Sequence, residues 1–215
     1  MCEVDGGSFA VMEHKERPIL FSGAMVRAIL DGRKTQTRRV VKAEIPEQLT
    51  HVRRLTNANG DEGAVITEHP DMRAGQLAAS VWCPYGKVGS RLWVREAHYV
   101  ERAPSEGETG FILYKATDHE APVSKWRPSI HMPRWASRIL LEVVGVRVER
   151  LNDISEDDAK AEGVDPNGPV GYIPAVMEMG MCRYQYANLW VSINGPGSWE
   201  KNPWVWVVEF RVVKP

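Results

Sequence analysis

The stretch Leu30-Asp31-Gly32-Arg33-Lys34-Thr35-Gln36-Thr37-Arg38-Arg39 is the most chemically loaded decapeptide of the chain. One lysine, two threonines and three arginines lie within the seven residues that end it. Like charges at this spacing repel one another, so a stretch that served only the fold would gain little from them. We therefore expect an acidic group to meet them, such as a phosphate, a nucleobase carbonyl or a carboxylate from elsewhere in the chain.

The residues before this stretch predict a strand followed by a short helix. Pro18-Ile19-Leu20-Phe21 is a short apolar strand pattern, and Ser22 is a good N-cap for a helix over 23–31. In that helix Met25, Val26, Ile29 and Leu30 share one face. Gly32 suits the left-handed position after the helix end. The basic stretch is therefore expected to leave a helix end and to face a ligand.

Length and composition indicate one domain. The chain has 215 residues, of which 43% are hydrophobic, enough for one good core with sizeable insertions. The net charge is −1, but residues 27–54 carry eight basic and three acidic side chains, a patch that suits nucleic acid or nucleotides. Three widely spaced cysteines, no signal pattern and no apolar run near 18 residues predict a soluble, cytoplasmic protein without disulfides or a membrane span.

The rest of the chain predicts a mixed fold. Residues 1–16 read as a flexible arm, and residues 17–215 read as a single domain with polar, irregular insertions at about 42–80 and 101–135. Strands are expected at 91–96, at 139–150, where Val144, Val146 and Val148 face inward, and at 204–213. Helices are expected from Ser155 to Glu162 and over 183–193. Without regular βαβ alternation, this favours an α+β fold built on a small mixed β-barrel.

Two common site types do not fit. A phosphate loop needs lysine directly after glycine and another glycine five residues earlier, whereas Arg33 separates Gly32 from Lys34. The ATPase and GTPase interpretations are therefore discarded. Cys83, His98, His119 and His131 do not have the spacing of a zinc site, so we expect no metal and no cofactor.

The order of several motifs resembles ASCH-domain proteins. Gly32-x-Lys34-x-x-Thr37-x-Arg39 is followed by Arg91-Leu92-Trp93-Val94-Arg95-Glu96, by the Asp153-Ile154-Ser155 helix start, by Ala159-Lys160-Ala161-Glu162 and by a final aromatic-rich strand. Cys83-Pro84-Tyr85-Gly86 and the segment from Trp126 to Trp135 are most similar to the larger bacteriophage- and prophage-encoded members. The likeness spans about residues 17–213 and implies a PUA-like β-barrel with short helices at its rim.

The resemblance also implies a chemistry. Small bacterial members of this family are amidohydrolases that remove the acyl group from N4-acetylcytidine, using a lysine, a threonine and a glutamate that correspond here to Lys34, Thr37 and Glu162. The implied partner is a nucleoside or RNA. This chain is longer than those enzymes by its two insertions, which can reshape or cover the pocket. Contacts to substrate or RNA are expected from the following residues: Arg33, Arg38, Arg39, Arg95, Trp126 and Arg127.

The residue chemistry is consistent with this role and sets a geometric condition. A threonine hydroxyl attacks only when a base takes its proton, and lysine serves as that base only if its pKa falls from about 10.4 to roughly 7–8. Neighbouring arginines lower the pKa of Lys34, whereas a nearby Glu162 would raise it. Because Lys34 and Thr37 are three apart, they face opposite sides of a regular strand, so a turn or bulge is required at Thr35-Gln36.

Several alternatives stay open. Lys34 and Glu162 can be solvated charges, and Thr37 can be an ordinary strand residue. The barrel can be a non-catalytic RNA- or nucleotide-binding module, and a ribonuclease would need an acid–base pair that the sequence does not reveal. Cys83 with His131 as its base is a further nucleophile pair. Trp126 and Trp135 can stack on a base or can close one barrel end.

Overall fold

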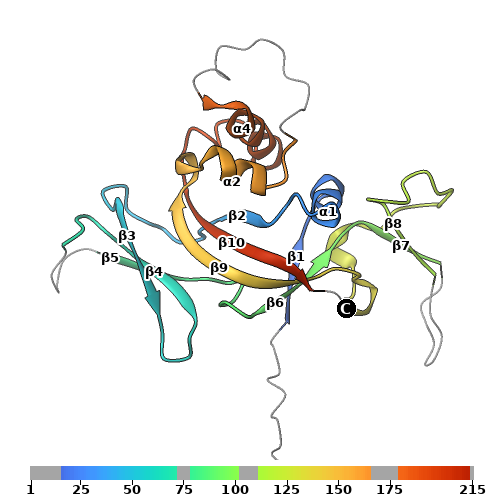
Figure 1. Ribbon diagram of the computed structural model, residues 1–215, viewed down its shortest axis with the longest axis horizontal. Coiled ribbons are helices and arrows are strands. Elements are labelled where there is room, and N and C mark those ends of the chain that lie inside the picture. The colour runs from blue at the N-terminus through green and yellow to red at the C-terminus, as the bar shows by residue number, and fades with distance from the viewer. Residues whose placement is uncertain (1–15, 72–77, 102–110, 166–178, 214–215) are drawn as a thin grey trace, which may run out of the picture.

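The computed structural model describes residues 16–71, 78–101, 111–165 and 179–213, and its centre is a five-stranded sheet (Figure 1). The strand order is β1-β6-β9-β10-β2. β1 runs parallel to β6, and the other neighbours are antiparallel. The strands are β1 Glu16–Leu20, β2 Gln36–Val40, β6 Arg91–Arg95, β9 Leu140–Arg150 and β10 Trp204–Val213.

This sheet is open in the described part of the chain. β1 and β2 are its two edges, and no described ladder joins them. The expected α+β class is confirmed, with mostly sheet and few helices, but the described strands form no closed barrel. The long, curved β9 and β10 run side by side through the middle of the molecule (Figure 1).

Two smaller sheets are built from segments that the sequence presents as polar and irregular. β3 His51–Thr56, β4 Glu62–Thr67 and β5 Ala78–Trp82 form an antiparallel sheet within the expected insertion at 42–80. β7 His98–Val100 pairs antiparallel with β8 Ile112–Tyr114, which lies within the expected insertion at 101–135. Two 3-10 helices follow, η1 Ser129–His131 and η2 Arg134–Ala136.

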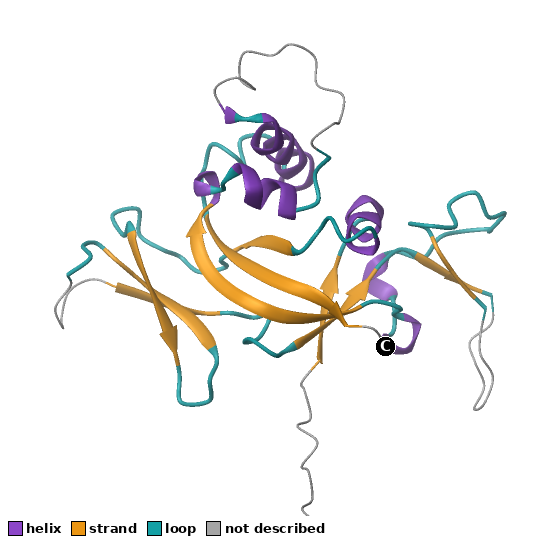
Figure 2. Ribbon diagram, viewed as in Figure 1, coloured by secondary structure: helices purple, strands orange, loops and turns teal. Residues whose placement is uncertain are grey.

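The helices follow their sequence signals. α1 Gly23–Leu30 begins after Ser22, whose side chain accepts from the N–H of Met25, and Gly32 has φ +74°. α2 Glu156–Ala161 begins after Ser155, whose hydroxyl accepts from the N–H of Asp158 at 3.0 Å. α4 Met181–Asn194 packs with α2 on one side of the β9–β10 pair, next to η3 Leu151–Asp153 (Figure 2).

β10 separates two hydrophobic cores. Trp206, Val208 and Phe210 contribute to a core with residues of β1, α1, β6 and β9. Val205 and Val207 point to the other face, where they join a second core with residues of α2 and α4. Side chains alternate across a strand, so one apolar run serves both cores, and the helix pair is fixed to the sheet by β10.

Two expected inward side chains point outward. Val144 is 44% exposed, because the β9–β10 register skips it between Gly145 and Val143, which makes a β-bulge that shifts the alternation by one residue. Val146 and Val148 are buried as expected. Leu30 is 47% exposed, since it ends α1 beyond the turn that packs on the sheet.

Several expectations fall partly outside the described residues. They are the arm at 1–16, of which only Glu16 is described, and parts of both insertions (72–77 and 102–110). Among the described helices, none combines the length and the apolar character that a membrane crossing requires.

Candidate functional site

Lys34 and Glu162 meet in the protein interior although 128 positions separate them in sequence. The Lys34 Nζ donates to the Glu162 Oε2 at 2.7 Å and to the Glu162 backbone oxygen at 2.8 Å. The two side chains are 0% and 2% exposed. A buried ammonium and carboxylate are costly to desolvate unless they pair, so this contact fixes both groups at one point.

The backbone around these residues explains how they meet. Lys34 and Glu162 form an isolated antiparallel bridge. Next to it, the Thr35 N–H donates to the carbonyl of Ala161 at 2.9 Å, and the Thr35 carbonyl accepts from the N–H of Phe210 at 2.8 Å. The chain therefore bonds to the end of α2 on one side and to β10 on the other, just before β2 begins.

Gly163 is required for this close approach. Its φ is +88°, a value that suits glycine, and a Cβ built there would lie 2.8 Å from both the Ala28 Cβ and the Lys34 Cβ. The backbone of Lys34 is also held from the α1 side, because its N–H donates to the carbonyl of Ala28 at 2.9 Å. The helix end, the lysine and the turn after α2 are thus packed as one unit.

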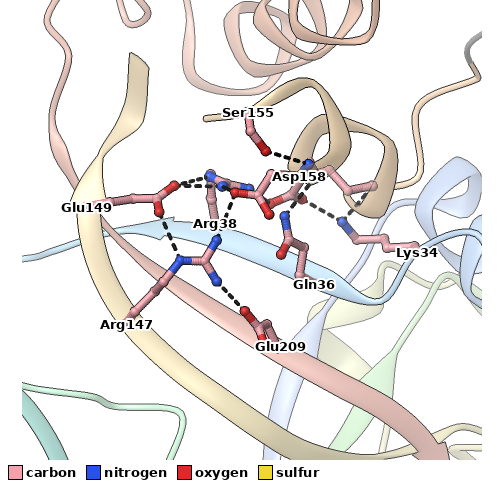
Figure 3. Close-up of polar contacts among 9 residues, drawn as sticks. Lys34, Gln36, Arg38, Arg147, Glu149, Ser155, Asp158 and Glu209 are labelled. Carbon is pink, nitrogen blue, oxygen red and sulfur yellow. Dashed lines mark hydrogen bonds and ion pairs between the residues drawn. The ribbon is translucent and has the colours of Figure 1, made fainter. Parts of the chain in front are cut away.

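Arg38 joins Glu162 to two further carboxylates. These belong to Glu149 and Asp158, which Figure 3 shows around the guanidinium. Its Nη1 donates to Glu162 at 3.1 Å, its Nη2 donates to Glu149 at 2.6 Å and to Asp158 at 2.9 Å, and its Nε donates to Glu149 at 2.9 Å. The guanidinium is wholly buried. The acidic group that the sequence analysis expects for the basic stretch therefore includes carboxylates of the same chain. The role of Arg38 in holding substrate stays a prediction, and the geometry gives it a second role, the positioning of Glu162.

An outer shell extends this network. Arg147 donates to Glu149 at 3.0 Å and to Asp158 at 2.9 Å, and it also contacts Glu209 (Figure 3). The Gln36 amide donates to the Asp158 backbone oxygen at 2.8 Å. Burial would raise the pKa of Asp158, but the charges of Arg38 and Arg147 lower it. This carboxylate therefore stays ionised at neutral pH and anchors the start of α2 to the sheet.

A cavity of about 340 Å³ lies beside the pair. Glu162, Thr37, Arg38 and Arg39 line its polar side, and aromatic and apolar side chains of α1, β1 and α4 line the rest. The latter include Phe21, Met25, Tyr186, Trp190 and Ile193. The Phe21 ring joins the two sides, because the Lys34 Nζ and the Arg39 guanidinium lie 5.6 Å and 5.4 Å from its centroid. Thr37 and Glu162 thus lie on one wall, and the lysine amine contacts this wall through Glu162.

The free edge of β2 also borders this cavity. The Thr35 carbonyl and the Val41 N–H bond to β10, so strand alternation turns the backbone groups of Arg38 and Val40 toward the opposite side. On that side, β2 has no strand neighbour among the described residues. The cavity can therefore offer a planar ligand both backbone N–H donors and carbonyl acceptors.

Thr37 meets only part of the geometric condition. Its side chain is 2% exposed and lies on the face of β2 that also carries Arg39, opposite Gln36 and Arg38. In the described contacts its hydroxyl has no hydrogen-bond partner, and Lys34 donates to Glu162 instead. Because Thr37 and Glu162 line one cavity, a substrate between them is needed to bring the hydroxyl into the network.

Burial shifts the pKa values of Lys34 and Tyr186 in opposite directions. Burial lowers the pKa of Lys34 below its usual value, and the contact with Glu162 offsets part of that effect. Burial also raises the pKa of Tyr186 well above its usual range, with a further contribution from the charge of Glu162. The lysine is therefore easier to deprotonate than a surface lysine, whereas the tyrosine is a neutral hydroxyl donor at physiological pH.

The other basic residues of the motif have different surroundings. Arg33 is exposed and donates to the Gly163 carbonyl at 2.9 Å and to Asp31 at 3.0 Å. Arg39 donates to the Leu20 carbonyl at 2.6 Å and lines the cavity, so it can meet a ligand there. Arg95 lies 5.4 Å from the Trp93 ring centroid and donates to the Ile130 carbonyl, away from the cavity lining.

Trp126 and Arg127 lie in a second cavity of about 620 Å³. Tyr99, Lys125, Pro128 and His131 share its lining. Pro128 is followed directly by Ser129, which lines the first cavity. Trp135 is 50% exposed and does not line either cavity.

The wall contributed by α4 is missing from the sequence analysis. Tyr186, Trp190 and Ile193 recur at helical spacing on one helix face, a pattern that also suits ordinary core packing. Their i, i+4 and i+7 positions identify one helix face, but the sequence does not tell whether that face meets a cavity or the core. Asp158 and Glu149 are missed for the same reason, because only the fold brings them to Arg38.

The rival nucleophile is less suited to its role. Burial raises the pKa of Cys83 to about 11, so the thiol is protonated near neutral pH. His131 lines the second cavity, and no described hydrogen bond links it to Cys83. Within the described ranges, no group of three or more His, Cys, Asp or Glu side chains is placed to hold a metal ion.

Comparison with known proteins gives no match: no family model, curated protein or solved structure matches this chain.

Proposed function

We propose that this chain is an ASCH-domain amidohydrolase that removes the acyl group from N4-acylated cytidine-type nucleosides, with its open sheet corresponding to the PUA-like barrel of that family. The observation that carries the proposal is the buried contact between Lys34 and Glu162 at the wall of a cavity that Thr37 also lines. Two of the three residues chosen by the motif resemblance, Thr37 and Glu162, line one cavity, and the third, Lys34, contacts Glu162 directly.

The first step is attack on the amide. The Thr37 Oγ1 forms a bond to the acyl carbonyl carbon, and its proton passes to the neutral amine of Lys34. The lowered pKa of Lys34 favours this proton transfer, since it increases the neutral fraction. The C–N bond then breaks, and the protonated lysine returns the proton to the exocyclic nitrogen of the departing cytidine.

The second step is hydrolysis of the resulting threonine ester. Glu162 accepts a proton from the attacking water, the acyl–Oγ1 bond breaks, and Thr37 regains its hydroxyl proton as the carboxylic acid leaves. Arg38 holds the other Glu162 oxygen at 3.1 Å and so fixes the carboxylate in place. A carboxylate held from two sides loses little orientation freedom during the reaction.

The cavity supplies the binding surfaces for such a substrate. The rings of Phe21 and Trp190 and the apolar chains of α4 suit the planar base and the acyl group. The free edge of β2 offers backbone donors and acceptors to the pyrimidine edge. The neutral hydroxyl of Tyr186 is a further hydrogen-bond donor on this wall.

The test is release of cytidine from N4-acetylcytidine by the purified protein. Thr37→Val, Lys34→Met and Glu162→Gln are each expected to lower kcat by at least about 100-fold, measured at a temperature where urea unfolding shows each variant to be folded. Thr35→Val is the matched control, because Thr35 is exposed and does not line the cavity. No turnover in the wild type, or full turnover in Thr37→Val, would refute the proposal.

A second candidate is a non-catalytic RNA- or nucleotide-binding module. The observation that favours it is the contact set of Lys34, whose amine donates to Glu162 and leaves the Thr37 hydroxyl outside the network. This candidate predicts salt-dependent RNA binding without turnover. The same cytidine assay, combined with a binding titration, separates the two functions.

A further inference from the structure

One short turn, which begins at Pro128 and Ser129 and is called the divider below, contributes to the lining of both cavities. Pro128 lines the cavity of about 620 Å³, and the next residue, Ser129, lines the cavity beside Glu162. Adjacent Cα atoms lie about 3.8 Å apart. The linings of the two cavities are therefore one residue apart along the chain at this turn.

Hydrogen bonds and a buried side chain hold the divider in place. The His131 N–H donates to the Pro128 carbonyl at 3.0 Å, and Met132, which is 1% exposed, is buried beneath the turn. Arg95 donates to the Ile130 carbonyl. The segment that carries Trp126 is fixed too, because Arg127 and His98 exchange two backbone hydrogen bonds of 2.7 and 3.1 Å. Side chains on such an anchored backbone form a preorganised surface.

The chemistry of the second cavity suits single-stranded nucleic acid. Tyr99 and Trp126 supply aromatic faces, and Lys125 and Arg127 supply positive charge. Among the described residues, neither cation forms an ion pair and no carboxylate lines this cavity. Stacking platforms beside backbone-tracking cations are the usual means of holding unpaired bases. A free nucleoside in the first cavity would leave these groups without a partner.

We propose that the substrate is an acylated cytidine within single-stranded RNA, with the reacting base beside Glu162 and a flanking nucleotide on Trp126 and Arg127. This inference rests on the proposed function. The flanking base stacks on Trp126, and the phosphate between the two nucleotides meets Arg127. The divider turn sets the distance between the two bound bases.

The experiment compares free N4-acetylcytidine with a five-nucleotide RNA that carries it at the centre. We expect kcat/KM to be at least about 10-fold higher for the RNA. Trp126→Ala should lower the RNA value by about 5- to 100-fold, the range for loss of one base–aromatic stack, and should remove the preference for RNA over the nucleoside. Trp135→Ala, an exposed tryptophan outside both cavities, is the matched control. Equal loss in both variants, or equal turnover of both substrates, overturns the inference.

A binding measurement tests the inference even if no substrate is hydrolysed. Fluorescence anisotropy with an unmodified five-nucleotide RNA should give at least about 5-fold weaker binding for Trp126→Ala. Arg127→Ala should lower the slope of log affinity against log salt by about 0.7, whereas Arg54→Ala on β3 should not. Absence of RNA binding, or equal slopes for the two arginine variants, refutes the polymer site, whereas absence of cytidine release refutes only the hydrolase.

Discussion

Replacement of Arg38 by methionine tests whether the buried charge network holds the site together. Met keeps much of the apolar volume but removes a guanidinium that makes four hydrogen bonds to three carboxylates. Its side chain is wholly buried, so water cannot take over these contacts. The variant therefore leaves Glu162, Glu149 and Asp158 with negative charges that have lost their common partner.

The expected cost is large for a single substitution. Removal of one partner from a buried ion pair destabilises a protein by about 3–5 kcal/mol. For a domain of this size each kcal/mol lowers the Tm by about 2–4 °C, so a fall of roughly 6–20 °C follows. Urea unfolding at pH 7, followed by tryptophan fluorescence, gives the free energy of unfolding directly.

The cost should shrink in acid. Because the pKa of Asp158 is lowered in the folded protein, its contribution to stability is present above its unfolded pKa of about 3.9 and is lost as the pH falls through the folded value. The difference between wild type and Arg38→Met should therefore be smaller at pH 3 than at pH 7.

Arg211→Met is the matched control. Arg211 also pairs with a carboxylate across the sheet, at 2.8 Å from Glu142, but its side chain is 68% exposed. Such exposed pairs contribute about 1 kcal/mol or less. If the free energies of unfolding of Arg38→Met and Arg211→Met lie within about 1 kcal/mol of each other, the buried network does not stabilise the fold more than an exposed ion pair does.

Three further outcomes are expected. Gly163→Ala should destabilise the fold by about 1–3 kcal/mol in urea unfolding, because it forces φ +88° on alanine and crowds the Lys34 Cβ; an unchanged midpoint would contradict this. Ser155→Ala should cost about 1 kcal/mol in the same assay through loss of its 3.0 Å cap, and Ser155→Asp should restore it. With its pKa at about 11, Cys83 should react with iodoacetamide far more slowly at pH 8 than a free thiol, as peptide mass spectrometry can measure; fast labelling would show that it is not buried.

The local signals in the sequence specified the elements well. α1 begins after Ser22 and ends before Gly32, as expected, and Ser155 caps α2. These predictions depend on neighbours within one turn, so the sequence contains all the interactions that decide them. The prediction that Val144 faces inward was wrong, because a bulge depends on two strands. The extra residue on β9 can be recognised only from its pairing with β10.

The site could be predicted only in part. No periodicity links Lys34 to Glu162, and their pairing was expected from the motif resemblance alone. The three internal carboxylate partners of Arg38 could not be predicted, since β9 and α2 reach it only in the folded chain. The segment 42–80 was predicted to be irregular because the side chains of β3 are mostly polar and exposed. It contains a sheet whose buried residues include Ala64 and Ile66.

The double burial of β10 has a consequence for the order of events during synthesis. Residues 204–213 leave the ribosome after every other described strand and helix, yet both cores require them. Until then the nascent chain exposes the apolar flanks of β9 and α4, which are surfaces that chaperones bind and that aggregate when crowded. Folding of the described part of the chain is therefore tied to the emergence of β10 rather than to that of β1.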